Sequence, residues 1–530
     1  FNYIYNKFID AKEFGSLISC DSLDYISLLN ELHEQNFIGL DLIEPIIKQA
    51  IILSNKYDIV ITNPPYMGKK SINNKLSAFL NEYYPNTKSE MYSAFIERCY
   101  NFTKVKGYQA MITIHTWMFI SSFQKVRELL LESGTLINMI HTGPATFPDL
   151  SSFNVLATTF CFKKERINSK TTFVRLADYY NVKEKLQNFN NKDNYYYLFA
   201  ETLKEVPGYP FIYWISDSLR KAFQNNKMLG KFYPPKQGLA TANNERFLRL
   251  WHEVDFDKIG FGCKNQDEAC SSNKKWFPYN KGGEYRKWYG NNDWIVNWEN
   301  GGFEIRNYKD ENGKLRSRPQ NIDCYFKKGM TWSLFGFENF GVRFKDYGFI
   351  FDVSGSSLFP DDKDLYYIIG YLCSNVAFKF LSLLAPTVNF QVGNIASLPF
   401  KKCNDEETLL EIENLVCENI ELCKNNWDIF ETSWDFKKNV LISNNKNLLK
   451  DQYSVFEEDY NIKRNKLREN EEKLNVIYKE IFEIKEDVED KVKDRDLSIK
   501  IFNKEEIIKS FISYVVGCMF GRSHFCRWKF

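Results

Sequence analysis

Short apolar segments alternate with amphipathic ones over the first 165 residues of the chain. Apolar runs rich in β-branched and aromatic residues predict strands. Apolar residues at helical spacing predict helices between them. The predicted strands cover residues 57–62, 107–114, 136–140 and 155–162, and the predicted helices cover residues 44–54, 91–102 and 123–132. This strand–helix order favours α/β architecture with a parallel, doubly wound sheet.

The strand predicted at residues 57–62 is short, apolar and β-branched, so we expect it to be buried. Asn63-Pro64-Pro65-Tyr66 follows it at once. The two prolines lack an N–H group, so they end the sheet ladder and hold the backbone rigid. Ligands of open α/β sheets bind beyond the carboxyl ends of strands. An amide and a ring held there in fixed geometry suit a planar, hydrogen-bonding ligand such as adenine.

Polar and aromatic residues also follow a second predicted strand, on the same side of the predicted sheet. His115, Thr116 and Trp117 directly follow the strand at residues 107–114. Lys69 and Lys70 follow the Asn63–Tyr66 segment in a long polar loop. That loop is either a contact for DNA phosphates or a solvated surface loop.

The remainder of the chain divides by composition. Residues 166–206 are polar and predict a connector between a domain at 1–165 and one at 207–403. Residues 207–403 combine aromatic strands and glycine-rich turns with lysines and arginines, which can contact phosphates and guanine edges. The candidate DNA-binding residues there are Lys275, Arg286, Arg316, Arg318 and Arg343, although each alone could be an ordinary surface charge.

Residues 404–530 are strongly charged and helical in pattern. Leu467, Leu474, Ile481 and Val488 recur every seven residues, with Ile477 and Ile484 between them. This spacing predicts a short seam between paired helices. We interpret this last region as a clamp or spacer without catalytic residues.

Composition adds few constraints. The net charge of +2 neither indicates nor excludes a nucleic-acid-binding protein, because a local basic face is sufficient. The twelve cysteines contain no CxxC pair, which is typical of reduced thiols in a cytoplasmic protein. We predict no metal site and no membrane contact.

The Asn63-Pro64-Pro65-Tyr66 segment matches the (Asn/Asp/Ser)-Pro-Pro-(Tyr/Phe) motif of DNA methyltransferases that methylate amino groups with S-adenosylmethionine. The longer stretch YDIVITNPPYMG at residues 57–68 resembles the adenine-specific enzymes related to type IIG restriction–modification proteins, and most closely the PglX type of BREX phage-defence systems. The resemblance implies a Rossmann-like methyltransferase sheet, an α+β target-recognition region and a helical C-terminal region. It also implies methylation of the N6 amine of adenine in double-stranded DNA.

The resemblance implies roles for individual residues. Asn63, Pro64, Pro65 and Tyr66 would form the catalytic segment, and Asn63 would also contact the cofactor. Phe147, or else Phe153, would pack against a base rotated out of the duplex, although either could instead fill the core. Asp10 would accept a hydrogen bond from the cofactor's adenine at the end of a strand, or it is a plain turn or N-cap residue.

Two features favour a chain that lacks the first part of its catalytic domain. The sequence begins at Phe1, and no FxGxG-type loop precedes Asn63. The alternative to a complete methyltransferase is therefore a DNA-recognition or assembly chain without the cofactor-binding half. For this chain alone we expect DNA binding without methylation. Other phage-defence proteins are its expected partners.

Overall fold

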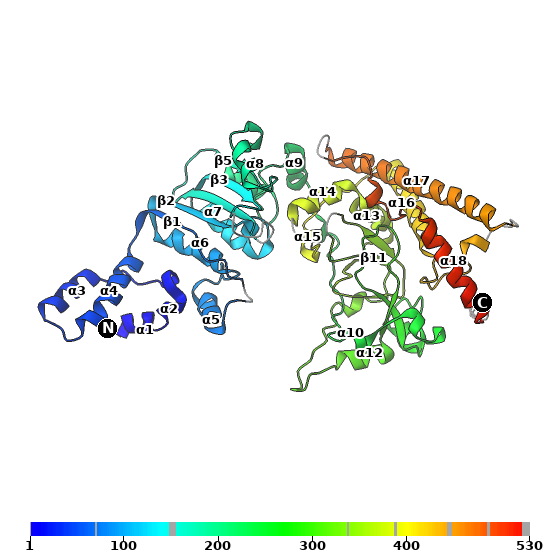
Figure 1. The fold of residues 1–530 in the computed structure, drawn as a ribbon, viewed down its shortest axis with the longest axis horizontal. Helices are drawn as coiled ribbons and strands as arrows, with labels where there is room; N and C mark the ends of the chain where they lie inside the picture. Colours follow the sequence, from blue (N-terminus) through cyan, green and yellow to red (C-terminus); the bar gives the residue numbers. More distant parts are fainter. Residues whose placement is uncertain are drawn as a thin grey trace. The chain divides into compact units, whose positions relative to one another are not determined.

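The computed structural model describes residues 2–68, 71–147, 155–336, 339–385, 389–442, 448–484 and 488–521. The chain forms two compact units, Phe1–Ile215 and Ser216–Phe530 (Figure 1).

The first unit begins with helices and continues with a sheet (Figure 1). Its helices are α1 (Asn2–Phe8), α2 (Ala11–Phe14), α3 (Tyr25–Glu34), α4 (Leu40–Ser54), α5 (Asn74–Tyr83), α6 (Met91–Phe102), α7 (Gln124–Glu132) and α8 (Val182–Asn188). Its strands are β1 (Tyr57–Thr62), β2 (Thr103–Ile114), β3 (Thr135–Gly143), β4 (Ala157–Lys163), β5 (Thr171–Arg175) and β6 (Tyr195–Leu198). The strands and helices predicted from the apolar pattern are all present, with ends shifted by a few residues in most cases.

The described strands of this unit form one sheet in the order β1-β2-β4-β3-β5-β6. Pairs β1–β2 and β3–β5 are parallel, whereas β4 runs antiparallel to both β2 and β3, and β6 runs antiparallel to β5. The expectation of a purely parallel sheet is therefore wrong, because β4 pairs antiparallel with both of its neighbours. Residues 166–206, which the sequence predicts as a connector, supply β5 and β6 of this sheet.

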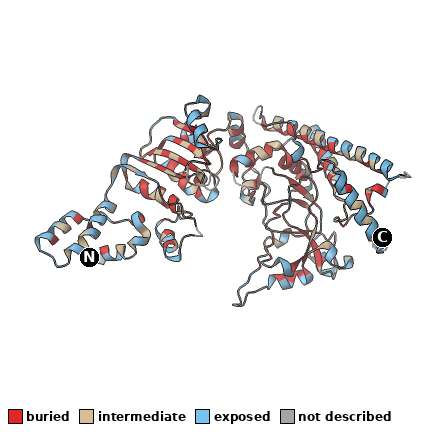
Figure 2. Ribbon diagram, in the orientation of Figure 1, coloured by how far each residue is buried: buried red, intermediate tan, exposed pale blue. Residues whose placement is uncertain are grey.

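Strand β1 has the predicted bounds but not the predicted burial. It lies at the edge of the sheet, with β2 as its one neighbour among the described strands. Ile59 is 63% exposed and Ile61 is 75% exposed. Figure 2 colours the ribbon by buried, intermediate and exposed residues. An apolar run predicts burial on both faces only where the strand is central, and periodicity does not reveal a strand's place in the sheet.

The N-terminal helices are tied to α6 by one buried arginine. Helices α1, α3 and α4 enclose a small core that includes Ile4, Tyr25 and Ile47. Arg98 on α6 is 3% exposed and donates hydrogen bonds to the backbone carbonyls of Ser16, Ile18 and Leu53. These bonds join α6 to the segment at residues 16–18 and to the last turn of α4.

The second unit combines small sheets with long helices (Figure 1). Its helices are α9 (Asp217–Asn225), α10 (Asn244–Phe247), α11 (Gln266–Ser271), α12 (Glu299–Arg306), α13 (Asp362–Cys373), α14 (Asn375–Leu384), α15 (Val392–Ala396), α16 (Glu406–Trp427), α17 (Leu449–Phe482) and α18 (Lys504–Met519). Its strands are β7 (Lys227–Met228), β8 (Leu248–Leu250), β9 (Trp276–Asn280), β10 (Trp294–Asn297), β11 (Gly329–Trp332), β12 (Val342–Lys345), β13 (Ile350–Phe351), β14 (Ser357–Leu358) and β15 (Pro399–Phe400).

The strands of this unit form three separate sheets within the described residues, in the orders β13-β9-β10-β8, β12-β11-β14 and β15-β7. A core cluster of this unit is rich in aromatic residues and includes Phe277, Tyr279, Trp298, Phe326 and Phe351. Taken singly, no described helix is both long and apolar enough to cross a membrane. The bent pair α13–α14 meets that criterion only when its two helices are taken together, at 68° to each other.

The predicted helical seam is present on α17. Leu467, Leu474 and Ile477 are buried, and α17 contacts α13, α14 and α16. The helix ends at Phe482 because Glu483 takes a left-handed conformation (φ 58°). Val488 therefore belongs to the segment after the helix, contrary to the heptad pattern.

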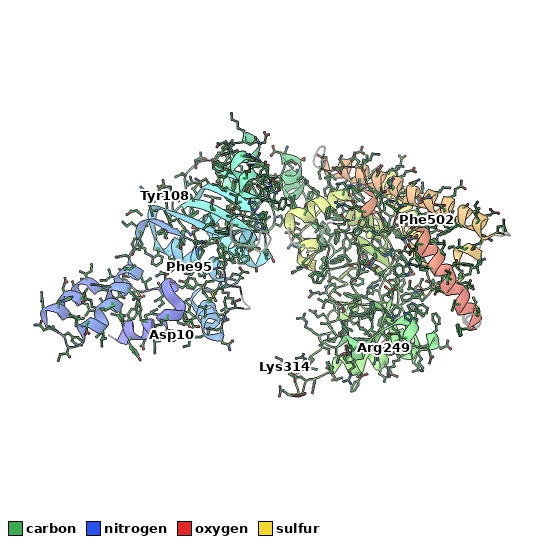
Figure 3. All side chains as sticks on the ribbon, viewed as in Figure 1. Asp10, Phe95, Tyr108, Arg249, Lys314 and Phe502 are labelled. Atoms are coloured by element: carbon green, nitrogen blue, oxygen red, sulfur yellow. The ribbon has the colours of Figure 1, made fainter. Side chains whose placement is uncertain are left out.

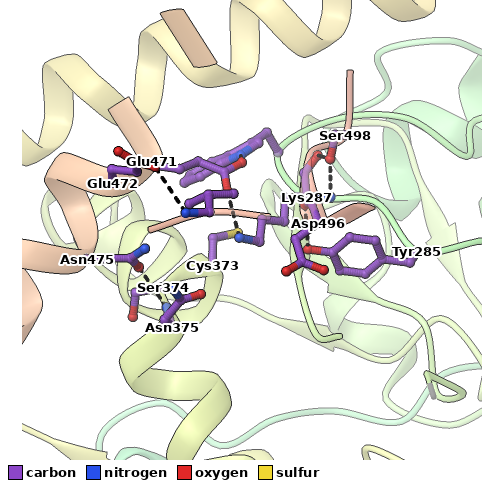
Figure 4. A network of polar contacts seen from close by, with 12 residues as sticks. Tyr285, Lys287, Cys373, Ser374, Asn375, Glu471, Glu472, Asn475, Asp496 and Ser498 are labelled. Carbon is purple, nitrogen blue, oxygen red and sulfur yellow. Dashed lines mark hydrogen bonds and ion pairs between the residues drawn. The ribbon is translucent and has the colours of Figure 1, made fainter. Parts of the chain in front are cut away.

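A buried polar network joins α17 to the aromatic sheets (Figure 4). Lys287 Nζ and Trp288 Nε1 each donate a 2.7 Å hydrogen bond to the Glu471 carboxylate on α17. The side chains of Lys287 and Glu471 are 5% and 2% exposed. Burial alone would lower the pKa of Lys287, but the adjacent Glu471 carboxylate holds that pKa above its usual value. These contacts cross the boundary predicted at residue 403, because Glu471 lies after it while Lys287 and Trp288 lie before it.

Replacing Glu471 with alanine is expected to destabilise the second unit by about 3–5 kcal/mol, because Lys287 would remain buried without a counter-charge. Chemical denaturation of the whole chain, followed by tryptophan fluorescence, measures this change. Asp459 provides the control on the same helix, since it pairs with Lys463 at an exposed position. Asp459→Ala should cost about 0.5 kcal/mol or less. Equal effects of the two substitutions would contradict the assignment.

Candidate functional site

Two neighbouring parallel strands place the Asn63–Tyr66 segment. Thr62, the last residue of β1, pairs with Met111 in β2, so the segment starts beside Ile112 at the carboxyl edge of the sheet. The far end of the loop is held by a bridge between Gly68 and Glu90, and by a hydrogen bond from Met91 N to Met67 O at 3.1 Å. The loop is thus fixed at both ends, and its two prolines stiffen the middle.

The side chains of the segment point in different directions. Pro64 is buried, whereas Asn63 and Pro65 are exposed. The Tyr66 hydroxyl donates a 2.8 Å hydrogen bond to Asn63 Oδ1, which orients the amide. Burial raises the pKa of Tyr66, so its hydroxyl stays protonated and remains a donor. A carbonyl oxygen has two lone pairs, and Asn63 Oδ1 therefore retains one for a ligand.

Aromatic rings surround Tyr66. The Phe147 ring lies 6.5 Å from the Tyr66 ring between centroids, and the buried Tyr92 packs edge-on at 6.4 Å. The structure thus brings together two of the residues that the sequence analysis proposed as contacts for a base. Their role stays a prediction, and Phe153, the second candidate, lies outside the described residues, as do Lys69 and Lys70.

Asp10 does not lie where the sequence analysis expected it. It sits in the turn between α1 and α2, at the N-cap position of α2, and its carboxylate accepts a 2.8 Å hydrogen bond from Lys75 (Figure 3). The strand-end location is therefore wrong, because the segment around Asp10 folds as two short helices. Asp10 lines a cavity of about 500 Å³ together with Lys75, Phe79 and Tyr83.

The candidate DNA-binding residues of the second unit differ in accessibility. Arg316 and Arg318 are exposed. Lys275 lies 3.6 Å from the Glu299 carboxylate, and Arg286 stacks over the Trp427 ring at 4.8 Å. Arg286 also lines a cavity of about 300 Å³.

The structure corrects the predicted DNA contact of Arg343. Only 2% of it is exposed, and burial lowers its pKa to about 10. Its Nη1 group donates to Ser333 Oγ at 3.2 Å, so its guanidinium is held inside the unit. The alternation of basic and aromatic residues did not reveal this burial, because β12 is covered on both faces. A direct contact between Arg343 and a DNA phosphate does not fit this structure.

The structure also shows a pair of histidines that the sequence analysis did not connect. His115 follows β2 and His141 lies in β3, and their rings are hydrogen-bonded between His115 Nδ1 and His141 Nε2 at 2.7 Å. The neighbouring residue Thr116 shares a 2.7 Å hydrogen bond with the Tyr92 hydroxyl. The position of His115 at a strand end was a signal in the sequence, but nothing in the sequence indicated its pairing with His141.

The chain is similar in sequence to known proteins. Residues 3–147 match the family described as Eco57I restriction-modification methylase. The chain is 34% identical over 547 aligned positions to the adenine-specific methyltransferase PglX of Lacticaseibacillus casei (strain Zhang), covering 98% of this chain and 45% of that protein. It is 35% identical to the adenine-specific methyltransferase BrxX of Escherichia coli O9:H4 (strain HS), covering 82% of this chain and 36% of that protein.

Among solved structures, the type IIL restriction-modification enzyme MmeI in complex with DNA has a similar fold. The TM-score is 0.50 at 11% identity, and the likeness covers 88% of this chain and 57% of MmeI. The chain spans less than half the length of the two curated relatives. It carries an Asn-Pro-Pro-Tyr segment at the carboxyl edge of a mixed α/β sheet, and it is a homologue of the PglX and BrxX adenine-specific methyltransferases.

Proposed function

We propose that the chain forms the base-binding and DNA-recognition part of a site-specific DNA methyltransferase. The enzyme transfers a methyl group from S-adenosylmethionine to the N6 amine of adenine in double-stranded DNA, in restriction–modification or phage defence. One observation carries the proposal. The rigid Asn63–Tyr66 segment lies at the sheet edge with one free acceptor lone pair on Asn63, in a homologue of adenine-specific methyltransferases.

The adenine amine is a weak nucleophile because its lone pair is delocalised into the ring. Asn63 Oδ1 and the Pro64 carbonyl would each accept one N–H of that amine. Two acceptors placed in this way favour a tetrahedral nitrogen whose lone pair is directed at the incoming methyl group, which is catalysis by positioning and electrostatics. Tyr66 and Phe147 would hold the base after its rotation out of the duplex.

The residues proposed for the cofactor do not form a cradle beside Asn63 in the described part of the chain. The Asp10 carboxylate is ion-paired with Lys75, and the cavity that Asp10 lines includes none of the residues from Asn63 to Tyr66. S-adenosylmethionine would supply the electrophilic methyl group. We assign no residue of this chain to it beyond the contact expected of Asn63.

The described residues form no cofactor cradle beside Asn63. This favours the second candidate function, a chain that recognises DNA but does not methylate it alone. The outer side of β1 has no partner strand among the described residues. Incubation with labelled S-adenosylmethionine and unmethylated DNA separates the two functions. The comparison uses the chain alone and a chimera joined to the part of the L. casei relative that the chain does not cover. Methylation by the chimera supports the proposed reaction, whereas DNA binding by both without methylation supports the second function.

Asn63→Ala should reduce methyl transfer by about 100-fold or more, because the acceptor acts mainly in the transition state. DNA affinity should change little. The turnover of the chimera measures the effect on methyl transfer. A filter-binding assay measures the effect on DNA affinity. Asn55→Ala is the control, since Asn55 is an exposed asparagine at the end of α4. Near-normal turnover of Asn63→Ala would rule out the assignment.

Tyr66→Ala and Phe147→Ala should each weaken binding to a duplex with an extrahelical adenine by roughly 1–3 kcal/mol, since each removes a stacking ring. Fluorescence titration with such a duplex measures the loss. Tyr66→Phe retains the ring and removes only the hydroxyl, so its affinity should stay near that of the wild type. If the alanine variants are folded and bind as tightly as the wild type, the two rings belong to the core.

Arg316 and Arg318 are the accessible candidates for phosphate contacts. Replacing both with glutamine should reduce the slope of log K against log salt concentration by roughly one per arginine. DNA titrations at several salt concentrations give the slope. Lys509→Gln on α18 changes the charge at another exposed position and should leave the slope unchanged. An unchanged slope in the double variant would contradict DNA contact at these arginines.

A further inference from the structure

The His115–His141 pair lies at the same edge of the sheet as Asn63. Strand β2 is parallel to β1, and β4 runs antiparallel to both β2 and β3, so β1, β2 and β3 all end at this edge. His115 is the first residue after β2, and His141 lies two residues before the end of β3. The pair therefore stands beside the predicted base-binding segment, although neither residue is used by the mechanism above.

A second link joins the pair to that segment. Thr116, next to His115, is hydrogen-bonded to the hydroxyl of Tyr92 at 2.7 Å. The Tyr92 ring packs edge-on against Tyr66, whose hydroxyl donates to Asn63. Side-chain contacts thus run from Asn63 through Tyr66 and Tyr92 to Thr116, the residue that follows His115 in the chain.

Burial decides which nitrogens of the pair carry protons. His141 is 3% exposed, and its Nδ1 atom is buried without a partner among the described residues. A buried N–H without an acceptor is rarer in proteins than a buried acceptor without a donor. His141 therefore has a bare Nδ1, and its Nε2–H donates to His115 Nδ1. The neutral His115 ring must then carry its own proton on Nε2.

The surroundings keep both rings uncharged. Burial lowers the pKa of His115 to about 4, and burial also lowers the pKa of His141 well below its usual value. The nearby charged side chains are Arg175, which is paired with Asp178, and Lys185, which donates to the Pro144 carbonyl. The Phe119 ring packs against both imidazoles, and the Trp214 ring packs against His141. His115 is thus a fixed neutral donor at neutral pH.

The His115 Nε2–H group is free to donate a hydrogen bond to a ligand. It has no hydrogen-bond partner in the described ranges, and unlike His141 Nδ1 it is not sealed inside the unit. Because His115 and Asn63 follow neighbouring strands at one edge of the sheet, that edge offers both a donor and an acceptor to a planar ligand. That combination matches adenine, whose amine donates and whose ring nitrogens N1, N3 and N7 accept. Guanine, in contrast, carries a hydrogen on N1.

We propose that His115 is a base-recognition residue whose Nε2–H, fixed by His141, donates a hydrogen bond to an unprotonated ring nitrogen of the extruded adenine. This inference rests on the proposed function and adds a specificity contact to it. His141 is then a positioning residue, because it acts only through the tautomer and orientation of His115.

The test measures binding of the chain to duplexes with the target adenine opposite an abasic position, so that the base is already unpaired. The target position is first located by mapping the adenines that the L. casei relative itself methylates or, where the chimera is active, those that the chimera methylates. Adenine is then replaced in turn by 1-deaza-, 3-deaza- and 7-deazaadenine, each of which lacks one acceptor nitrogen. One of the three analogues should bind the wild-type chain about tenfold more weakly than adenine does.

Variants show whether His115 is the donor. In His115→Phe the weakened analogue and adenine should bind equally, because the partner of the missing nitrogen is gone. His115→Gln places an amide donor near the Nε2 position and should retain part of the preference. His33→Phe on α3 controls for the loss of an exposed histidine and should behave as the wild type. A residue with a purely structural role would weaken binding of all duplexes alike and leave the preference in place.

Each outcome is decisive. If the wild-type chain binds adenine and all three analogues equally, the inference is wrong even where His115→Phe fails to fold. If the preference exists and persists in folded His115→Phe, another residue is the donor and the inference is again wrong. If the chain binds no DNA, the proposed function itself fails. Loss of the preference in His115→Phe, together with its partial retention in His115→Gln, would support the assignment.

Discussion

The parallel pairing of β1 with β2 is the constraint on which the candidate site depends. Its register, Thr62 opposite Met111, sets Asn63 beside the end of β2 and brings the Tyr66 hydroxyl within 3.4 Å of the Ile112 carbonyl. A shift of one residue would turn the side chains of β1 to the opposite face. The prolines then keep the segment from continuing along β2, so the amide and the ring are presented at the edge.

The antiparallel strand β4 has a second effect on the same edge. It separates β2 from β3 and pairs with both, so the ends of these strands stay within reach of one hydrogen bond between two imidazoles. The site is therefore built from three strand ends and one connecting loop. Its polar groups are an oriented amide oxygen and a neutral imidazole, and its walls are aromatic. Such a site discriminates by hydrogen-bond direction and not by charge.

The second unit relies on a different interaction. Glu471 on α17 satisfies both Lys287 and Trp288, and the backbone N–H of Lys287 donates to Ser498 Oγ at 2.7 Å. A buried pair of this kind is weak evidence for net stability, but loss of one partner is costly. The pair therefore fixes how the charged helices close over the aromatic sheets. It also shows why basic residues in an aromatic region are not all available to DNA, since Lys287 and Arg343 are both inside.

The sequence by itself determined the local helices and strands and the Asn63–Tyr66 segment at the end of β1. The bounds of β1 and of helix α6 follow from the apolar pattern, because periodicity and turn residues act over a few neighbouring positions. Only the tertiary structure decided that β1 is an edge strand, that β4 is antiparallel, that Arg343 is buried and that His115 meets His141. These features depend on contacts between residues far apart in the chain, and a local pattern of apolar and polar positions carries no record of which strands become neighbours.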